Sequence, residues 1–330
     1  MLTPVNTLAS IGTILPTLTP AKTLTPTATM FPTPLPFTGK IAFLWSSSGN
    51  WYSDEHLYVM NADGSGLTDV TPPTLPINSR HFTWSPDGQY LVFDAFEDNA
   101  YQIFKIKPDG SDLTQLTFEK EDSFLPSWSP DGKNIMFTSS RETIVDNNGY
   151  IQQQIYIMKS DGTEIRRFLV KTKADTSPMR GSYRKDGLIA VEEPVTRWAV
   201  TNYVVNPDGV IQNQFLEFWT TDGPPAWSPD GRFAVYTTYS AYFASDCLGL
   251  VLRKFDGSEK CLMIGERKDP PVYALAVSWS PDGKYFLLTA NVEDSKKADI
   301  YVMSIDGTEL TRLTYFSEGF VGSAIWSSGP

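Results

Sequence analysis

The chain is poor in the side chains that carry most thiol and metal chemistry. Its 330 residues include only two cysteines and two histidines. Long apolar runs are also missing, because the hydrophobic stretches extend over only a few residues, and we therefore expect no membrane-spanning segment. The first residues, MLTPVNTLASIG, lack the basic start and the apolar stretch of a recognisable signal peptide.

Positive charge is scarce as well. The chain has 27 Lys and Arg against 38 Asp and Glu, for a formal net charge of −11 at pH 7. This balance disfavours nucleic acid or an anionic membrane surface as the main partner. The Gly-x-Ser-x-Gly elbow of hydrolases and the Ser-x-Asp-x-Gly-x-Thr-Trp box of sialidases are absent. The adjacent carboxylates Glu192 and Glu193 are expected by chance in so acidic a chain.

Residues 1–38 form a segment rich in threonine and proline. They contain eleven Thr and seven Pro, and Lys22 is their only charged side chain. Proline fixes φ and removes hydrogen-bond donors, and threonine disfavours a helix, so the composition predicts an extended, semi-rigid spacer. Such stalks usually hold a domain off a cell surface, and an ordinary disordered tail is the alternative interpretation.

The rest of the chain, residues 39–330, repeats two motifs in alternation. The first is Trp-Ser-Pro-Asp-Gly followed by a short apolar run, as in WSPDGQYLVF. The second is an alternating strand, an Asp-Gly turn and another strand, as in QIFKIKPDGSDLTQLT. There are six copies of each, of which the first motif is complete in four, degraded at Tyr183 and cut off after Trp326. The aromatic anchors of the first motif are Trp84, Trp128, Tyr183, Trp227, Trp279 and Trp326.

Both motifs predict hairpins. In the first, proline presets φ, aspartate binds the neighbouring backbone and glycine takes the left-handed position. Each period then holds four antiparallel strands, A to D, and six such sheets arranged radially make an all-β, six-bladed β-propeller. The residues assigned to these structural turns are Trp84, Pro86, Asp87, Gly88, Trp128, Asp131, Gly132, Trp227, Asp230, Gly231, Trp279, Asp282, Gly283 and Trp326.

The two ends of the repeat array predict how the ring closes. Residues 39–46 have the pattern of a strand B with no strand A before it, and residues 323–330 that of a strand A with nothing after it. Pairing the two completes the sixth blade and removes the exposed edges of an open array. We therefore expect Trp326 to lie beside Ile41 to Leu44.

Together the two motifs resemble the WD-type repeat of TolB-like six-bladed propellers. The resemblance covers roughly residues 39–330 and implies the propeller fold. Its shared residues make turns and inter-blade packing, so it transfers no functional residue. The N-terminal α/β domain that TolB adds to its propeller has no counterpart in this sequence. The repeats also resemble the propellers of prolyl-oligopeptidase-type peptidases and of some oligosaccharide lyases.

The two faces of such a propeller differ in content. The A–B and C–D turns share one face, the turn face, and the B–C and D–A loops share the other, the loop face. The loop face holds the variable segments, in which binding on a rigid scaffold is normally found. The side chains expected at the channel mouth are Arg80, His81, Arg180 and Tyr273. Those expected in an aromatic rim are Trp51, Tyr52, Tyr150, Trp198, Tyr242 and Phe243.

Two groups of residues have the right chemistry for a metal ion. The eleven aspartates of the turn face are suited to calcium, but turn chemistry accounts for every one of them. His56 and His81 fall on the same face of neighbouring blades and, with Asp54 or Glu55, match the ligand types of a metal site. We favour the interpretation that His56 and His81 are two separate polar residues of the rim, and we expect no cofactor.

Cys247 and Cys261 flank the predicted C–D hairpin of the fifth blade. In an exported protein, two cysteines usually pair. A turn at Asp256–Gly257 would place Cys261 opposite Leu252, several residues out of register with Cys247. Whether the two cysteines form a disulfide therefore stays open.

These patterns favour a monomeric, bacterial propeller outside the cytoplasm that binds a protein or a glycan at its loop face and channel mouth without catalysing a reaction. The competing hypothesis is a propeller-type polysaccharide lyase or hydrolase that acts at the channel mouth. Convergence of His81, Arg80 and carboxylates in a deep pocket with an ordered metal would favour the enzyme. A shallow, aromatic-rimmed funnel without metal would favour binding.

Overall fold

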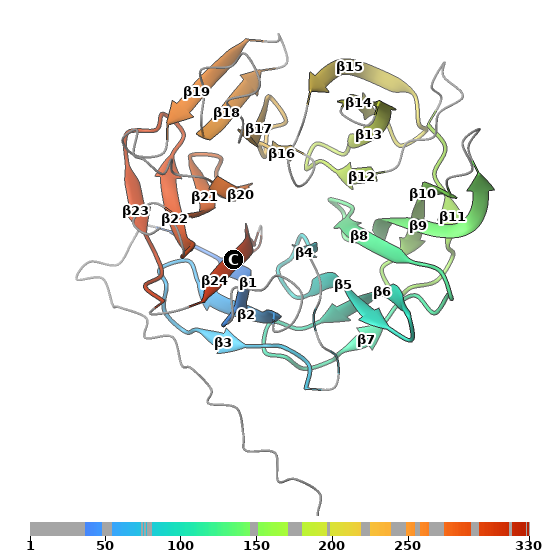
Figure 1. Ribbon diagram of the computed structural model, residues 1–330, viewed down its shortest axis with the longest axis horizontal. Helices are drawn as coiled ribbons and strands as arrows, with labels where there is room; N and C mark the ends of the chain where they lie inside the picture. The colour runs from blue at the N-terminus through green and yellow to red at the C-terminus, as the bar shows by residue number, and fades with distance from the viewer. Residues whose placement is uncertain are drawn as a thin grey trace, which may run out of the picture.

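A computed structural model of the chain shows six four-stranded antiparallel sheets arranged around a central axis (Figure 1). It describes residues 37–47, 55–73, 75, 77, 81–145, 151–170, 180–196, 199–218, 225–238, 249–254, 258–263, 274–291, 297–316, 319–327 and 329. All regular elements in these ranges are strands, so the predicted all-β, six-bladed propeller is confirmed. None of the described segments is a helix long and apolar enough to cross a membrane.

Each blade is one sheet of four strands, which pair in the order first to fourth. Blade 1 consists of β24 (Phe320–Trp326), β1 (Lys40–Ser46), β2 (Glu55–Asn61) and β3 (Thr68–Asp69). Blade 2 consists of β4 (Phe82–Trp84), β5 (Leu91–Glu97), β6 (Ala100–Ile106) and β7 (Thr114–Gln115). Blade 3 consists of β8 (Ser123–Trp128), β9 (Asn134–Val145), β10 (Ile151–Lys159) and β11 (Arg166–Arg167).

The other three blades follow the same order. Blade 4 consists of β12 (Arg180–Tyr183), β13 (Ile189–Thr196), β14 (Ala199–Val205) and β15 (Ile211–Phe218). Blade 5 consists of β16 (Ala226–Trp227), β17 (Phe233–Thr238), β18 (Gly249–Lys254) and β19 (Glu259–Met263). Blade 6 consists of β20 (Ala274–Trp279), β21 (Tyr285–Ala290), β22 (Asp299–Ser304) and β23 (Leu310–Arg312). The first strand of each blade lies nearest the axis (Figure 1).

The Trp-Ser-Pro-Asp-Gly turns are closed by the same hydrogen bonds in four blades. In blade 2, Ser85 Oγ donates to Asp87 Oδ1 at 2.6 Å, and Asp87 Oδ1 also accepts the Gln89 N–H at 3.0 Å. Gly88 has a φ of +70°, which glycine adopts without strain. The aspartates that repeat this pattern are Asp131, Asp230 and Asp282. The motif aspartates of these four turns thus serve the turns themselves.

The ring closes as the two ends of the repeat array predict. β24 pairs with β1 in antiparallel register, with Trp326 opposite Ile41. The Trp326 indole N–H donates to Thr38 O at 2.9 Å, and its ring makes an edge contact with Phe37, with 5.5 Å between the centroids. The chain therefore enters the propeller beside the strand that ends it.

Apolar side chains on both faces of the inner strands pack the blades against one another. Leu91 and Phe93 of β5 belong to a cluster shared with blade 1, whereas Val92 between them belongs to a cluster shared with blade 3. This alternation arises because successive side chains of a strand point to opposite faces of the sheet. It explains why the strands after each motif turn are apolar on both faces rather than on one.

The C–D hairpin of blade 5 differs by one residue from the prediction. Cys261 pairs with Val251, not with Leu252. Three residues rather than two separate Lys254 from Ser258, and the Lys254 N–H donates to the Ser258 carbonyl at 2.9 Å. The longer loop shifts the register by one. Cys261 is disulfide-bonded, and Cys247 lies outside the described residues.

Trp326→Ala is expected to lower the free energy of unfolding by about 3–5 kcal/mol, because a large buried side chain is lost from the blade that closes the ring. Urea titration of the purified chain measures this change. Leu310→Ala, at an exposed position of β23, serves as the control and should change the stability by no more than about 0.5 kcal/mol. Equal losses in the two variants would contradict the role assigned to Trp326.

Candidate functional site

Comparison of equivalent positions in the six blades singles out two acidic residues. The compared position is on strand B of each blade. It lies three residues after the residue that pairs with the aromatic anchor of strand A. It is occupied by Leu44, Asp94, Thr138, Glu192, Thr237 and Thr289 in blades 1 to 6, respectively. Threonine is thus the commonest residue, and the acids of blades 2 and 4 depart from it.

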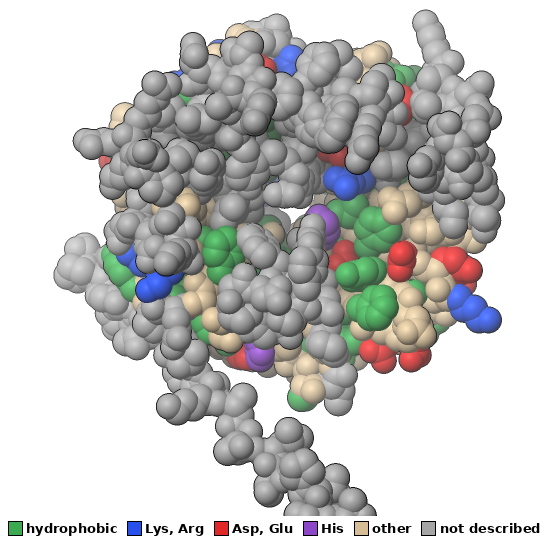
Figure 2. Space-filling model, in the orientation of Figure 1, with side chains coloured by type: hydrophobic (Ala, Val, Ile, Leu, Met, Phe, Trp, Pro, Cys, Tyr) green, Lys and Arg blue, Asp and Glu red, His purple; other side chains and the backbone are tan. Residues whose placement is uncertain are grey.

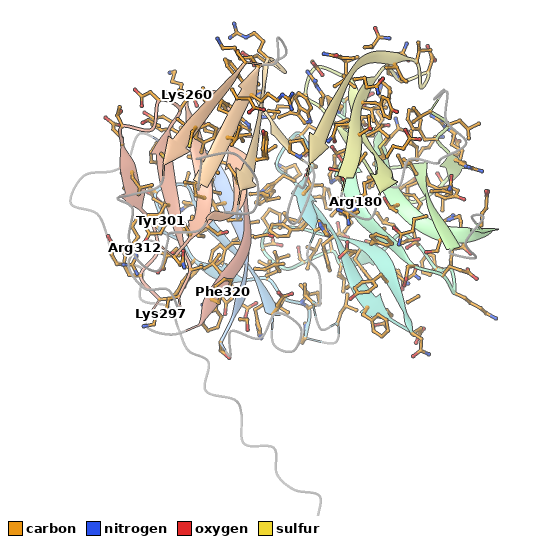
Figure 3. The ribbon with its side chains drawn as sticks, turned by 45° about the horizontal axis from the view of Figure 1, so that its top comes forward. Arg180, Lys260, Lys297, Tyr301, Arg312 and Phe320 are labelled. Carbon is orange, nitrogen blue, oxygen red and sulfur yellow. The ribbon has the colours of Figure 1, made fainter. Side chains whose placement is uncertain are left out.

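Each of the two acids faces a basic side chain. His81 Nδ1 lies 3.9 Å from Asp94 Oδ2, and Arg180 Nη1 lies 3.8 Å from Glu192 Oε2. Arg180 is the first residue of β12 and pairs directly with Glu192 of β13. Figure 3 shows Arg180 at the inner edge of blade 4. In both pairs the basic residue lies at or directly before the start of the first strand of its blade, and the acid lies within the second strand.

Asp94 holds the neighbouring blade in place. Its carboxyl group is buried, and Oδ2 accepts the Leu125 N–H of blade 3 at 2.9 Å. Leu125 lies in a β-bulge of β8 with a φ of +57°, which is uncommon for a residue other than glycine. Thr289 bridges blades 6 and 1 in the same way, because its Oγ1 donates to Gly322 O at 2.9 Å. Asp94 therefore has a structural task.

Glu192 has no comparable task among the described residues. Its side chain is only 6% exposed, and its Oε1 has no hydrogen-bond partner in the described part of the chain. Burial raises the pKa of Glu192, and the positive charge of Arg180 opposes this increase. The Arg180 side chain is 42% exposed and accessible to a ligand. A buried carboxyl with an unused acceptor beside an accessible guanidinium is typical of a binding or catalytic site.

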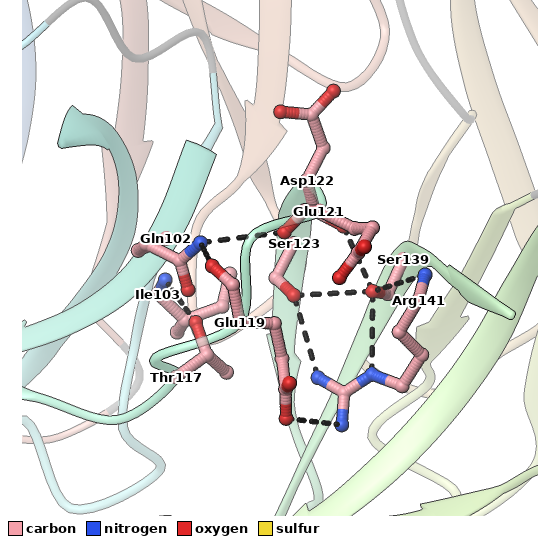
Figure 4. A network of polar contacts seen from close by, with 9 residues as sticks. All are labelled: Gln102, Ile103, Thr117, Glu119, Glu121, Asp122, Ser123, Ser139 and Arg141. Carbon is pink, nitrogen blue, oxygen red and sulfur yellow. Dashed lines mark hydrogen bonds and ion pairs between the residues drawn. The ribbon is translucent and has the colours of Figure 1, made fainter. Parts of the chain in front are cut away.

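A polar network fixes the loop that leads from blade 2 to blade 3 (Figure 4). Gln102 Nε2 donates to Glu119 O at 2.8 Å, and Arg141 Nη2 donates to Ser123 Oγ at 3.4 Å. Burial lowers the pKa of Arg141, and Glu119, 3.6 Å away, opposes this change. The network gives the loop a fixed conformation that leaves Phe118 75% exposed.

The two histidines lie beside different acids. His56 Nδ1 lies 2.8 Å from Asp69 Oδ2, whereas His81 lies beside Asp94. Figure 2 shows them as separate purple patches, with acidic and basic side chains beside the central opening. Within the described ranges, no three His, Cys, Asp or Glu side chains are grouped to bind a metal ion. Asp54, the other acid considered for this site, lies outside those ranges.

Most of the residues predicted at the channel mouth and in the aromatic rim also lie outside the described residues. This applies to Trp51, Tyr52, Arg80, Tyr150, Trp198, Tyr242, Phe243 and Tyr273. His81 and Arg180 are described, and the structure brings each of them to a buried acid. Sequence reasoning missed Asp94 and attributed Glu192 to chance. The available signal was that both stand where most other repeats have threonine.

Known proteins resemble this chain mainly in its propeller. The family model described as TolB beta propeller domain matches residues 83–270. The chain is 27% identical over 192 residues to an uncharacterised protein of Agrobacterium fabrum, covering 56% of this chain and 61% of that protein. It is 35% identical over 91 residues to the Tol-Pal system protein TolB of Alcanivorax borkumensis, covering 26% of this chain and 20% of that protein.

The fold likeness extends to solved structures. TolB from Acinetobacter baumannii matches with a TM-score of 0.62 and 19% identity, covering 88% of this chain and 67% of that one. Kuenenia stuttgartiensis hydrazine synthase matches with a TM-score of 0.66 and 14% identity, covering 89% and 47%. At these identities the likeness shows the fold alone. The chain spans less than two thirds of the length of the two curated relatives from Agrobacterium and Alcanivorax.

Glu192→Gln tests the state of the buried carboxyl. Because burial raises its pKa in the folded protein above the ordinary value of 4.5, Glu192 stabilises the fold below that value, and this contribution is lost as the pH rises through the folded pKa. The stability of E192Q relative to the natural chain should therefore be higher at about pH 8 than at about pH 4. Urea titrations at the two pH values measure this difference, and a difference that does not change with pH would contradict the assignment.

Proposed function

Because the chain belongs to the TolB β-propeller family, we propose that it is a non-enzymatic binding propeller that works outside the cytoplasm and recognises a protein at its loop face and channel mouth. The observation that carries the proposal is the pair of Arg180 and Glu192. A binding surface needs polar groups that the fold itself does not use. Glu192 supplies such a group at a position where Thr289 serves the contact between blades.

Three observations support a location outside the cytoplasm. One of the relatives is a protein of the Tol-Pal system. Cys261 is disulfide-bonded, and disulfides persist mainly in oxidising compartments. Residues 1–38 have the composition of a stalk that spaces a domain from a surface.

The entry of the chain into the propeller favours the loop face as the binding surface. Phe37 contacts the rings of Tyr285 and Trp326, with centroids 4.9 and 5.5 Å apart, respectively. The Tyr285 carbonyl accepts the Ser280 N–H that closes the A–B turn of blade 6, so Phe37 lies at the turn face. A propeller held by its N-terminal segment therefore presents its loop face away from the point of attachment.

Capture experiments with two sets of variants test the proposal. The natural chain, the double variant His81→Ala/Arg180→Ala and the double variant Lys133→Ala/Lys284→Ala are immobilised and exposed to an extracytoplasmic extract of the source bacterium. The two lysines belong to exposed A–B turns and serve as the turn-face control. We expect the natural chain and the lysine variant to capture the same protein. The His81/Arg180 variant should capture at least about tenfold less of it.

Two results would contradict the proposal. Equal capture by all three proteins would move the binding surface away from the channel mouth. Binding to an array of bacterial glycans, without capture of a protein, would show that the ligand is a glycan and not a protein.

A further inference from the structure

Five contacts between neighbouring blades contain an apolar cluster of buried side chains. These clusters lie between blades 1 and 2, 2 and 3, 3 and 4, 5 and 6, and 6 and 1. Among the described residues, no apolar cluster joins blade 4 to blade 5. Among the described residues, polar groups contribute to the contact between these two blades.

At the turn face, Arg184 makes this contact. It takes the place of the motif serine in the altered copy SYRKDG, and it is buried. Its guanidinium carbon lies 4.2 Å from the centroid of the Trp227 ring in blade 5, and its Nη2 donates to Gly231 O at 2.8 Å. A cation over an aromatic face and a charged hydrogen bond thus join the two blades at this end.

Nearer the loop face, Glu192 faces the same contact. Ile189 and Val191 of β13 belong to the apolar cluster shared with blade 3. Because successive strand residues point to opposite sides, Glu192 points toward blade 5. Asp94 shows the same direction in blade 2, where it reaches Leu125 of the following blade. The buried carboxyl of Glu192 therefore lies where the described residues form no apolar cluster between blades.

The carboxyl of Glu192 is incompletely compensated by the described residues. Its Oε1 has no donor among them, and an unused buried acceptor costs free energy. Arg180 Nη1, at 3.8 Å from Oε2, lies beyond hydrogen-bonding distance. The threonines of blades 3, 5 and 6 are neutral and can both donate and accept, whereas an ionised carboxylate only accepts. The group that complements it best is a donor with a positive charge.

We propose that Glu192 is the binding site for a cationic side chain, the ammonium of a lysine or the guanidinium of an arginine, which a partner protein inserts between blades 4 and 5 at the loop face. This inference rests on the proposed function, because it names the group that the partner presents. A neutral hydroxyl would satisfy the free acceptor but add nothing to the charge compensation that Arg180 gives at 3.8 Å, whereas the cation does both.

Selection of peptides from a random library displayed on phage tests the site. The library is panned on the natural chain, and each enriched peptide is measured against the natural chain, Glu192→Gln and Glu193→Gln. Glu193 is the matched control, because it is also buried but its Oε2 accepts the Tyr203 hydroxyl at 2.6 Å on the opposite side of β13. Thermal unfolding of both variants verifies that they fold.

We expect the enriched peptides to share one lysine or arginine. E192Q should bind them about tenfold less tightly or worse, and E193Q should bind them as the natural chain does. Replacing the shared basic residue by norleucine should weaken binding to the natural chain by a similar factor and leave binding to E192Q almost unchanged, because the two groups act as a pair.

The failures of the two proposals can be told apart. Peptides that lack a basic residue, or that E192Q binds as tightly as the natural chain, would overturn the cation site while leaving a binding propeller. A panning that enriches no peptide over a blank surface would overturn the proposed function and the site with it.

Discussion

The pairing of β24 with β1 is the contact on which the rest of the structure depends. Blades 1, 2, 3 and 6 have apolar clusters on both faces, so each of them is buried only if it has a neighbour on each side. An open array would expose the edge of β1 and the cluster that includes Ile41, Phe43 and Trp326. Pairing with the last strand of the chain covers both the edge and the cluster. The contacts of Trp326 with Phe37 and Thr38 fix these two residues at the same place.

The fold could be predicted from the sequence because its motif residues have few alternatives. A serine, an aspartate and a glycine at fixed spacing close the same turn in four blades, and the hydrogen bonds of Asp87 recur at each copy. The register of the blade 5 hairpin could not be predicted, because an Asp-Gly pair is compatible with a loop of two or of three residues. One residue of loop length placed Cys261 opposite Val251 instead of Leu252.

The candidate site could be predicted only in part from the sequence. Topology alone places His81 and Arg180 near the ends of inner strands, as the repeat predicts. In the sequence, Glu192 differs from other acids only in standing where most other repeats have threonine, and its burial and free oxygen become visible only in the structure. Departures from the repeat are informative at this position because Thr289 shows what the fold itself requires there. In a repeat protein, the recurring pattern builds the shape and the exceptions are the candidates for function.

The central claim is that the loop face binds a partner through groups that the propeller does not need for its own stability. A crystal structure of the chain bound to the partner that it captures tests this claim most directly. The account predicts a partner on the loop face, with a lysine or arginine nitrogen within hydrogen-bonding distance of Glu192 Oε1. A partner seated on the turn face, with Glu192 still buried and unpaired, would contradict it.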